Sequence, residues 1–324
     1  MSSTSSMSNT AGQGRAAIGS IGSIMRDHLT YIIFGVVTLF FAVAAPNFAT
    51  FSTAEAILRV TALVSIMAVG MSFVIICAEI DLSVGSLASW SSMLVAMALD
   101  RGVPALAAPF VVLACGALVG LVNGLLVTKL RIPSFLVTLG MLSVLSGLAL
   151  TVTDTMPVPI VSDGYSDALW NARLFGLPVP ILWTAVIVVV GYYLLHLSVF
   201  GRRVFAVGGG VTAARFSGVK TDQVKVWAFV LSGMTASLAG MMLAARSTAG
   251  NPSLGKGLEL DVIAAVIIGG TSLFGGQGSI IGSLVGAIFI GILGFGLLVM
   301  GLSTSIQEII KGAIIILAVA LNRR

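Results

Sequence analysis

The chain has 324 residues, of which 57% are hydrophobic and only 9% are charged, whereas a soluble domain contains about 25% charged residues. This composition argues against a water-soluble fold, and the long continuous apolar runs disfavour a transmembrane β-barrel, whose strands alternate in short segments. The formal net charge is +5, but the basic residues punctuate apolar runs, so we expect no nucleic-acid partner. The sequence predicts an all-α fold, a polytopic transmembrane helical bundle.

The chain divides into a short polar tail and a long apolar domain. Residues 1–26 are rich in Ser, Gly and Ala and cannot bury a core, which predicts a flexible cytoplasmic tail. Residues 27–324 form the predicted transmembrane domain, in which 57–99 and 259–300 leave room for broken or re-entrant helices. Since one crossing needs ~20 mostly apolar residues, we expect about ten spans, near residues 28–45, 57–77, 82–99, 105–128, 133–153, 180–199, 226–245, 259–275, 277–300 and 304–321.

Basic residues set the predicted orientation, because Lys and Arg are enriched in cytoplasmic loops. The loop 201–225 contains five basic residues and one acid, Asp222, and is assigned to the cytoplasm. Both termini then lie in the cytoplasm. The loop 154–178 lies outside and, with its Pro, Tyr and Trp residues, is expected to form a folded cap. The basic charge of this loop has three explanations: the orientation rule alone, contact with anionic membrane lipid, or docking of a partner.

Glycines recur at intervals of four residues in two helices, where they allow another backbone to approach closely. Ordinary packing within the bundle explains them, and a seam between two copies is the alternative. The two series are Gly116, Gly120 and Gly124, then Gly278, Gly282 and Gly286.

The sequence contains no convincing enzymatic site. The segment 250–257 nearly matches a phosphate-binding loop, but Gly257 replaces the hydroxyl residue that would bind magnesium, and the segment lies on the predicted outer face. The two histidines, His28 and His196, lie at predicted helix ends, away from any nucleophile or metal-ligand pattern. We therefore expect neither catalysis, a metal nor a cofactor in this chain, and any ATP must be hydrolysed by another subunit.

Acidic residues inside apolar spans are costly and often functional. Glu79 and Asp81 precede the helix near Leu82 and are predicted to cap it, although ion coupling is an alternative role. Capping or gating is likewise predicted for Glu259 and Asp261, at the start of the eighth span. The spacing of Glu308 and Lys311 predicts an ion pair along the last helix.

Four ordered segments resemble the ribose-type permeases of bacterial ABC importers, which transport monosaccharides. The resemblance covers most of the chain from about residue 55 onward, and the sequence departs from the family pattern at Ala78-Glu79 and Val211-Thr212. The matching segments read IDLSVGS at 80–86, GRRVFAVGG at 201–209, AARFSGV at 213–219 and ELDVIAAVIIGGTSLFGGQGS at 259–279.

The resemblance implies a permease subunit in the bacterial inner membrane that works with other proteins. These are a cytoplasmic ABC ATPase, a periplasmic sugar-binding protein and a second permease copy or paralogue. It also implies that a short helix in the loop 201–225 couples the permease to the ATPase, and Gly218 is a suitable helix stop. The coupling residues are Ala213, Ala214, Arg215, Phe216, Ser217 and Gly218.

The predicted function is import of a sugar or polyol by alternating access, driven by the separate ATPase. Hydroxyl and amide side chains can exchange hydrogen bonds with a sugar without fixed charge. Two alternatives are an ion-coupled secondary transporter, which the intramembrane acids would suit, and an ABC permease for branched-chain amino acids. The candidate path residues are Ser83, Ser86, Ser89, Asn123, Ser143 and Thr271.

Overall fold

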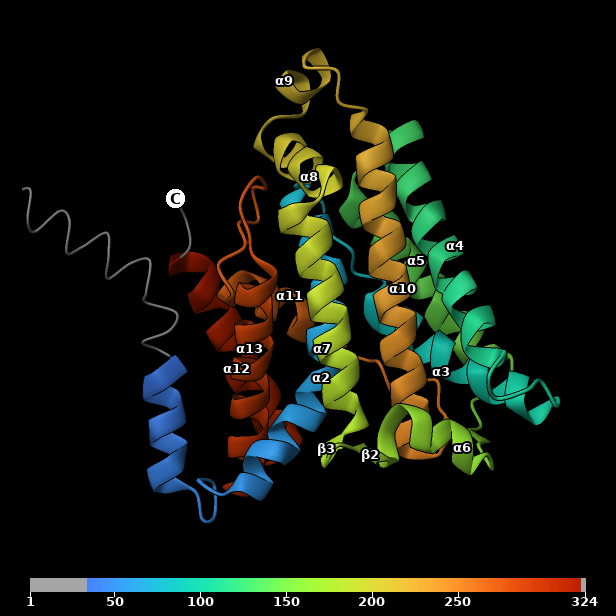
Figure 1. Ribbon diagram of the computed structural model, residues 1–324, viewed down its shortest axis with the longest axis vertical. Helices are drawn as coiled ribbons and strands as arrows, with labels where there is room; N and C mark the ends of the chain where they lie inside the picture. The colour runs from blue at the N-terminus through green and yellow to red at the C-terminus, as the bar shows by residue number, and fades with distance from the viewer. Residues whose placement is uncertain (1–33, 322–324) are drawn as a thin grey trace, which may run out of the picture.

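The computed structural model describes residues 34–321, which form a bundle of α-helices with two short β-ribbons (Figure 1). The predicted tail, residues 1–26, lies outside the described residues. An apolar helix, Phe34–Ala44, comes first. The labelled helices are α2 (Phe51–Ile76), α3 (Val84–Asp100), α4 (Ala108–Lys129), α5 (Ser134–Thr151), α6 (Asp163–Ser166), η1 (Asp167–Asn171), α7 (Val179–Tyr192), η2 (Tyr193–Leu197), α8 (Val199–Gly209), α9 (Val211–Phe216), α10 (Thr221–Ser247), α11 (Leu258–Ile268), α12 (Ile280–Val299) and α13 (Thr304–Leu321). The strands are β1 (Val158–Pro159), β2 (Arg173–Leu174), β3 (Leu177–Pro178) and β4 (Ala249–Gly250).

Two helices, α2 and α10, form the centre of the bundle. In the most apolar 18-residue stretch of each helix, 89% of the residues of α2 and 83% of those of α10 are buried. The same fraction is 28% in α5 and 22% in the continuous helix formed by α7 and η2. The central helices are therefore surrounded by protein, whereas the outer helices leave apolar side chains exposed. This distribution is expected when the outer faces contact lipid or another subunit instead of water.

Each predicted span corresponds to a helix, but ten complete crossings are not confirmed. Within the described residues, six helices are long and apolar enough to cross a membrane. Helix α11 has only 11 residues, so it extends about 16 Å, roughly half of the ~30 Å hydrocarbon core. The chain also leaves helical structure at 77–83 and 269–279, within the two stretches, 57–99 and 259–300, where the sequence leaves room for broken helices.

The interruption between α2 and α3 keeps its backbone polar groups bonded within the protein. Ala78 adopts a left-handed conformation, with φ of 59°, and the next amide, of Glu79, donates to the Val74 carbonyl at 3.1 Å. The Ile80 amide donates to Ser134 Oγ at 3.2 Å, and Thr138 Oγ1 donates to the Ile80 carbonyl at 3.3 Å. The first turns of α5 thus hold this non-helical segment, as burial away from water requires.

The glycines of α4 bring it close to α10. A Cβ atom at Gly120 would lie 2.2 Å from the Phe229 carbonyl oxygen, and one at Gly233 would lie 2.2 Å from the Gly116 carbonyl oxygen. In the second series, a Cβ at Gly286 would lie 2.0 Å from the Ala265 carbonyl oxygen in α11. These glycines therefore mediate packing within one chain, and the packing interpretation of both series is confirmed.

The loop 154–178 forms a folded cap at the end of the bundle opposite α9 (Figure 1). Strand β1 pairs antiparallel with β4, and the buried Tyr165 donates its hydroxyl to the Met241 carbonyl at 2.8 Å. Burial also raises the pKa of Tyr165, so the phenol remains a donor. The guanidinium groups of Arg59 and Arg246 each lie 5.5 Å from the centre of the buried Trp170 ring. The prediction of a folded cap is confirmed.

One predicted ion pair is wrong. Lys311 lies 2.7 Å from Asp261 Oδ2 on α11, and this pair replaces the predicted contact with Glu308. Glu308 lies on the exposed side of α13, whereas both partners of the observed pair are largely shielded, which strengthens their attraction. The pair joins α13 to the short helix α11.

A single methyl group at the α4–α10 contact should destabilise the bundle. Replacing glycine by alanine inside a helix normally stabilises it by up to about 1 kcal/mol, but Gly120→Ala would clash with backbone atoms of α10. We expect a net loss of about 1–3 kcal/mol, measured as a lower midpoint of thermal unfolding in detergent. Gly140→Ala on α5 is the control, because its Cβ would have no atom within 4 Å; equal midpoints would contradict the packing analysis.

Candidate functional site

A buried carboxylate lies deep inside the bundle, where the chain between α2 and α3 is not helical. Asp81 is only 1% exposed and contacts Ser232 of α10. From the start of α10 at Thr221, Ser232 is about 16 Å along the helix at 1.5 Å per residue. This is about half the thickness of a bilayer core. The interruption therefore places a carboxylate well inside the bundle, about 16 Å along α10 from its start and surrounded by protein.

Three donors satisfy this carboxylate. Its Oδ1 accepts from the Ser83 amide at 3.1 Å and from Ser83 Oγ at 2.6 Å, and its Oδ2 accepts from Ser232 Oγ at 2.8 Å. The Asn123 amide group in turn donates to Ser83 Oγ at 3.0 Å. None of the ion pairs among residues 34–321 includes Asp81. The network links α4 and α10 to the start of α3 through hydrogen bonds alone.

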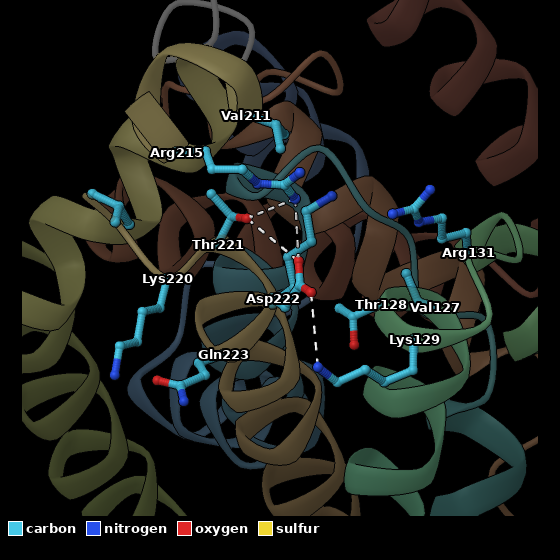
Figure 2. Close-up of a pocket in the computed structure, with 12 residues that line it drawn as sticks. Val127, Thr128, Lys129, Arg131, Val211, Arg215, Lys220, Thr221, Asp222 and Gln223 are labelled. Atoms are coloured by element: carbon cyan, nitrogen blue, oxygen red, sulfur yellow. Dashed lines mark hydrogen bonds and ion pairs between the residues drawn. The ribbon is translucent and has the colours of Figure 1, made fainter. Parts of the chain in front are cut away.

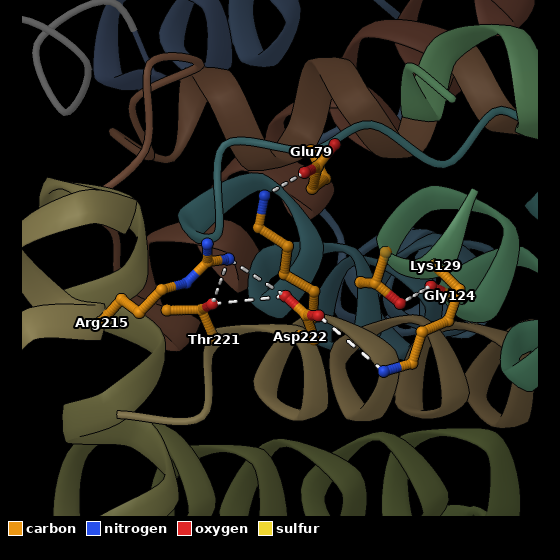
Figure 3. Close-up of polar contacts among 8 residues, drawn as sticks. Glu79, Gly124, Lys129, Arg215, Thr221 and Asp222 are labelled. Carbon is orange, nitrogen blue, oxygen red and sulfur yellow. Dashed lines mark hydrogen bonds and ion pairs between the residues drawn. The ribbon is translucent and has the colours of Figure 1, made fainter. Parts of the chain in front are cut away.

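The two acids of this segment have different surroundings. Asp81 accepts the amide of Ser83, two residues further along the chain; Ser83 is the N-cap residue of α3, and no side chain in the described part of the chain caps that helix end. Glu79 instead pairs with Lys225 near the start of α10 (Figure 3). Lys225 and Ser232 were not predicted as partners, because both are far away in the sequence and no local pattern identifies them. The roles of Glu79 and Asp81 in transport remain predictions.

The acids at the start of α11 also approach other helices. Glu259 lies against the first turn of α3, since a Cβ at Gly85 would be 2.0 Å from Glu259 Oε2. The positive end of the α3 dipole favours a carboxylate there. Asp261 pairs with Lys311. Both acids thus connect α11 to neighbouring helices, and their predicted capping or gating roles remain predictions.

Five of the six candidate path residues are buried inside the chain, and one is not. Ser86 Oγ donates to the Ser83 carbonyl at 2.9 Å, and Ser89 Oγ accepts the Gly255 amide at 2.8 Å. Ser143 lies on the exposed side of α5, apart from the others. Their part in a path remains a prediction. The buried members are Ser83, Ser86, Ser89, Asn123 and Thr271.

The predicted coupling segment forms helix α9, at the end of the bundle opposite the cap (Figure 1). The helix ends at Phe216, and Gly218 follows with φ of 81°, as expected for a helix stop. Phe216 is 88% exposed. Ala214, another of the predicted coupling residues, is only 5% exposed, because that side of α9 packs against its own chain.

A pocket of about 610 Å³ opens between α9, the start of α10 and the end of α4 (Figure 2). Arg215 and Lys129 converge on Asp222 from opposite sides, at 3.4 and 4.0 Å. Arg215 also donates to Thr221 Oγ1 at 3.3 Å. The pocket is lined by Val127, Thr128, Lys129, Arg131, Val211, Arg215, Val219, Lys220, Thr221, Asp222, Gln223 and Lys225.

Similarity to known proteins identifies this helical bundle. A family described as the permease component of a branched-chain amino acid transport system matches residues 53–319. The chain belongs to this permease family. The resemblance to ribose-type permeases is also confirmed: the permease is 39% identical to the ribose import permease protein RbsC of Escherichia coli K12, over 86% of this chain and 88% of that relative.

Other relatives of the permease are similar over comparable lengths. RbsC of Bacillus subtilis strain 168 is 40% identical, over 83% of this chain and 84% of the relative. The L-arabinose ABC transporter permease protein AraH of Azospirillum brasilense is 36% identical, over 95% of this chain and 90% of the relative. No solved structure matches the chain.

Substitutions of Asp81 should separate a structural acceptor from an ion carrier. Asp81→Asn retains an acceptor oxygen for the Ser83 amide, and the Ser232 hydroxyl can rotate to accept from the new amide group. We expect a cost of about 1 kcal/mol or less. Asp81→Ala leaves buried donors unpaired, at about 1–3 kcal/mol each. Thermal unfolding in detergent and sugar uptake would measure both effects.

The control for this series is Asp100→Ala, at the exposed opposite end of α3, which should change neither quantity. Equal loss of uptake in the Asn and Ala variants, together with dependence on an ion gradient, would show that Asp81 carries an ion.

Proposed function

We propose that this chain is the membrane-spanning permease subunit of an ATP-binding-cassette importer for a sugar or polyol. The observation that carries this proposal is its identity of 39–40% to two ribose import permeases over more than four fifths of its length. The relative named for L-arabinose extends the same similarity to a second pentose. The apolar helices agree with a multi-pass protein of the inner membrane.

The two alternative functions are not favoured. The matching family is described by branched-chain amino acids, but the individual relatives that cover most of the chain are named for ribose and arabinose. An ion-coupled transporter would need acids that can bind an ion at middle depth. Asp81 is instead surrounded by three hydrogen-bond donors, which supports a structural role.

The proposed partners occupy opposite ends of the bundle. Phe216 on α9 is 88% exposed and would supply an apolar contact point on a basic surface. This surface would bind the ATPase, which hydrolyses the ATP. The cap at the other end (Figure 1) would receive the periplasmic sugar-binding protein. A second permease copy or paralogue and membrane lipid would cover the exposed apolar faces of α4, α5 and α7.

In the membrane, the chain would make about ten passes with both termini in the cytoplasm. Helices α3 and α11 are shorter than the central helices, and α11 continues into the non-helical segment 269–279. We count them as incomplete passes whose remaining depth is crossed by buried non-helical chain. Such chain is tolerated in a bilayer only where protein surrounds it.

The contacts suggest how the movement of the closing ATPase would be transmitted to the proposed path residues. Helix α9 is followed within a few residues by α10, whose Lys225 is paired with Glu79 (Figure 3). Two residues later, Asp81 contacts Ser232 further along α10 and the start of α3. A displacement of α9 would therefore move α10 and the interrupted segment together. Alternating access would follow when this rearrangement opens the buried polar residues to one side and then the other.

Cysteine labelling tests the orientation. With Cys115→Ala to remove the less buried native thiol, Val161→Cys on the cap should react with an impermeant reagent added outside the cell. Gln223→Cys should react only in inverted vesicles. Both positions are exposed. Reaction of both from the same side would contradict the proposed topology.

A matched pair of substitutions tests the coupling role. Phe216→Asp should reduce co-purification of the ATPase at least tenfold and abolish sugar uptake, because a carboxylate would be buried in the interface. Phe175→Asp makes the same change at a site that is 91% exposed on the opposite end, and it should leave ATPase binding intact. Co-purification and vesicle uptake of radiolabelled ribose and arabinose are the measurements.

In the unmodified importer, uptake should require ATP and persist when ion gradients are dissipated. Normal uptake by the Phe216→Asp variant would remove the coupling assignment, and gradient-driven uptake without ATP would overturn the proposed function.

A further inference from the structure

The pocket beside α9 lies at the depth where two membrane helices end. Helix α4 ends at Lys129 and α10 begins at Thr221, and both are long and apolar enough to cross a bilayer. Both helix ends line the pocket, and Val211 and Arg215 of α9 close one side of it (Figure 2). Helix ends of this kind lie at the level of the lipid headgroups.

The pocket has an excess of positive charge. Its lining contains five cationic side chains and one acid, Asp222, which Arg215 and Lys129 share. Lys225 is paired with Glu79 outside the lining. Two of the five cations therefore remain without an acidic partner in the part of the chain that the structure describes. These are Arg131 and Lys220, which stand on either side of the pocket (Figure 2).

An apolar strip adjoins the charged lining. Leu130, between the lining residues Lys129 and Arg131, is 64% exposed, and Phe135 and Leu136 at the start of α5 are 50% and 54% exposed. Exposed leucines and valines continue along α4 away from the pocket. A ligand that matches this surface needs an anionic head at the helix ends and apolar chains that extend along α4 and α5.

We propose that the pocket binds the phosphate-bearing headgroup of an anionic phospholipid. The volume of about 610 Å³ is within the usual range of small-molecule sites, roughly 300–1,000 Å³, and basic pockets between membrane helices are suited to such headgroups. This proposal rests on the proposed function in one respect, which is the assignment of this face to the cytoplasmic side of the membrane. A soluble anion would leave the apolar strip unused. An acidic side chain of the ATPase would have to reach past α9, toward the membrane.

The bound lipid would hold the junction of α9 and α10 against the end of α4. Its phosphate would lie near Arg131 and the pair formed by Arg215 and Asp222, and Lys220 would add positive charge on the other side of the pocket (Figure 2). Because this junction follows the coupling helix, the lipid would bridge the moving segment and a peripheral membrane helix. Anionic lipid would then be a structural part of the permease, and neutral lipid could not replace it.

The test is lipid binding to the purified full-length chain. Native mass spectrometry would follow titration with phosphatidylglycerol and, separately, with phosphatidylcholine. The Arg131→Gln/Lys220→Gln variant should bind phosphatidylglycerol on the order of twentyfold more weakly, since each cation near anionic lipid contributes a factor of about five. Arg202→Gln/Arg203→Gln is the control; it removes two exposed charges from α8, outside the pocket, and should bind as the unmodified chain does.

Several outcomes would overturn the proposal. Equal weakening in both variants would indicate general electrostatic attraction, and equal affinity for phosphatidylcholine would exclude headgroup recognition. Competition by soluble glycerol phosphate at the same concentration would indicate a site for free anions. Unchanged lipid binding with loss of ATPase co-purification would assign the pocket to the partner. Thermal unfolding of both variants would confirm that they are folded.

Because this binding assay needs neither ATP, sugar nor partner, its result is independent of the proposed function. Failure of sugar import with selective lipid binding intact would refute only the importer assignment.

Discussion

Every backbone amide and carbonyl at membrane depth must find a partner within the protein, and this requirement shapes the centre of the permease. The chain leaves helical structure after Ile76, so the groups at 77–83 lose their regular helical partners. Hydroxyls of α5 and the end of α2 bond to this segment. Asp81, held in the same segment, then bonds to the amide that precedes α3. An interruption that would be costly in lipid is stable because the neighbouring helices surround it.

Local patterns in the sequence were sufficient to predict much of this architecture. Long apolar runs located the helices, the Gly218 stop defined the end of α9, and the Pro- and Trp-containing loop became the cap. The number of complete crossings was not predictable, because hydropathy does not distinguish a full span from a half-length helix such as α11 followed by buried loop.

Long-range partners were not predictable from the same patterns. The contacts between Glu79 and Lys225 and between Asp81 and Ser232 join residues about 150 positions apart, and nothing in the local sequence specifies such pairs. Lys311 was assigned to Glu308 because they lie one turn apart, yet the long lysine side chain reaches α11 instead. The orientation of α9 was also set by tertiary packing, which buried Ala214. Helix position is thus encoded locally, whereas the polar contacts depend on the assembled bundle.

The contact between α4 and α10 has a further mechanical consequence. At Gly120 the backbone of α10 lies directly against the glycine, and at Gly116 the small Ser237 side chain and the Gly233 carbonyl take up the space beside it, so no long side chain separates the two helices there. Long side chains packed between two helices must change rotamer before the helices can slide, whereas a contact between small groups has fewer rotamers to change. The glycine seam would therefore allow α10 to shift along its own axis while it remains tightly packed. An axial displacement at the start of α10 would then be transmitted along nearly the full length of the helix to the cap.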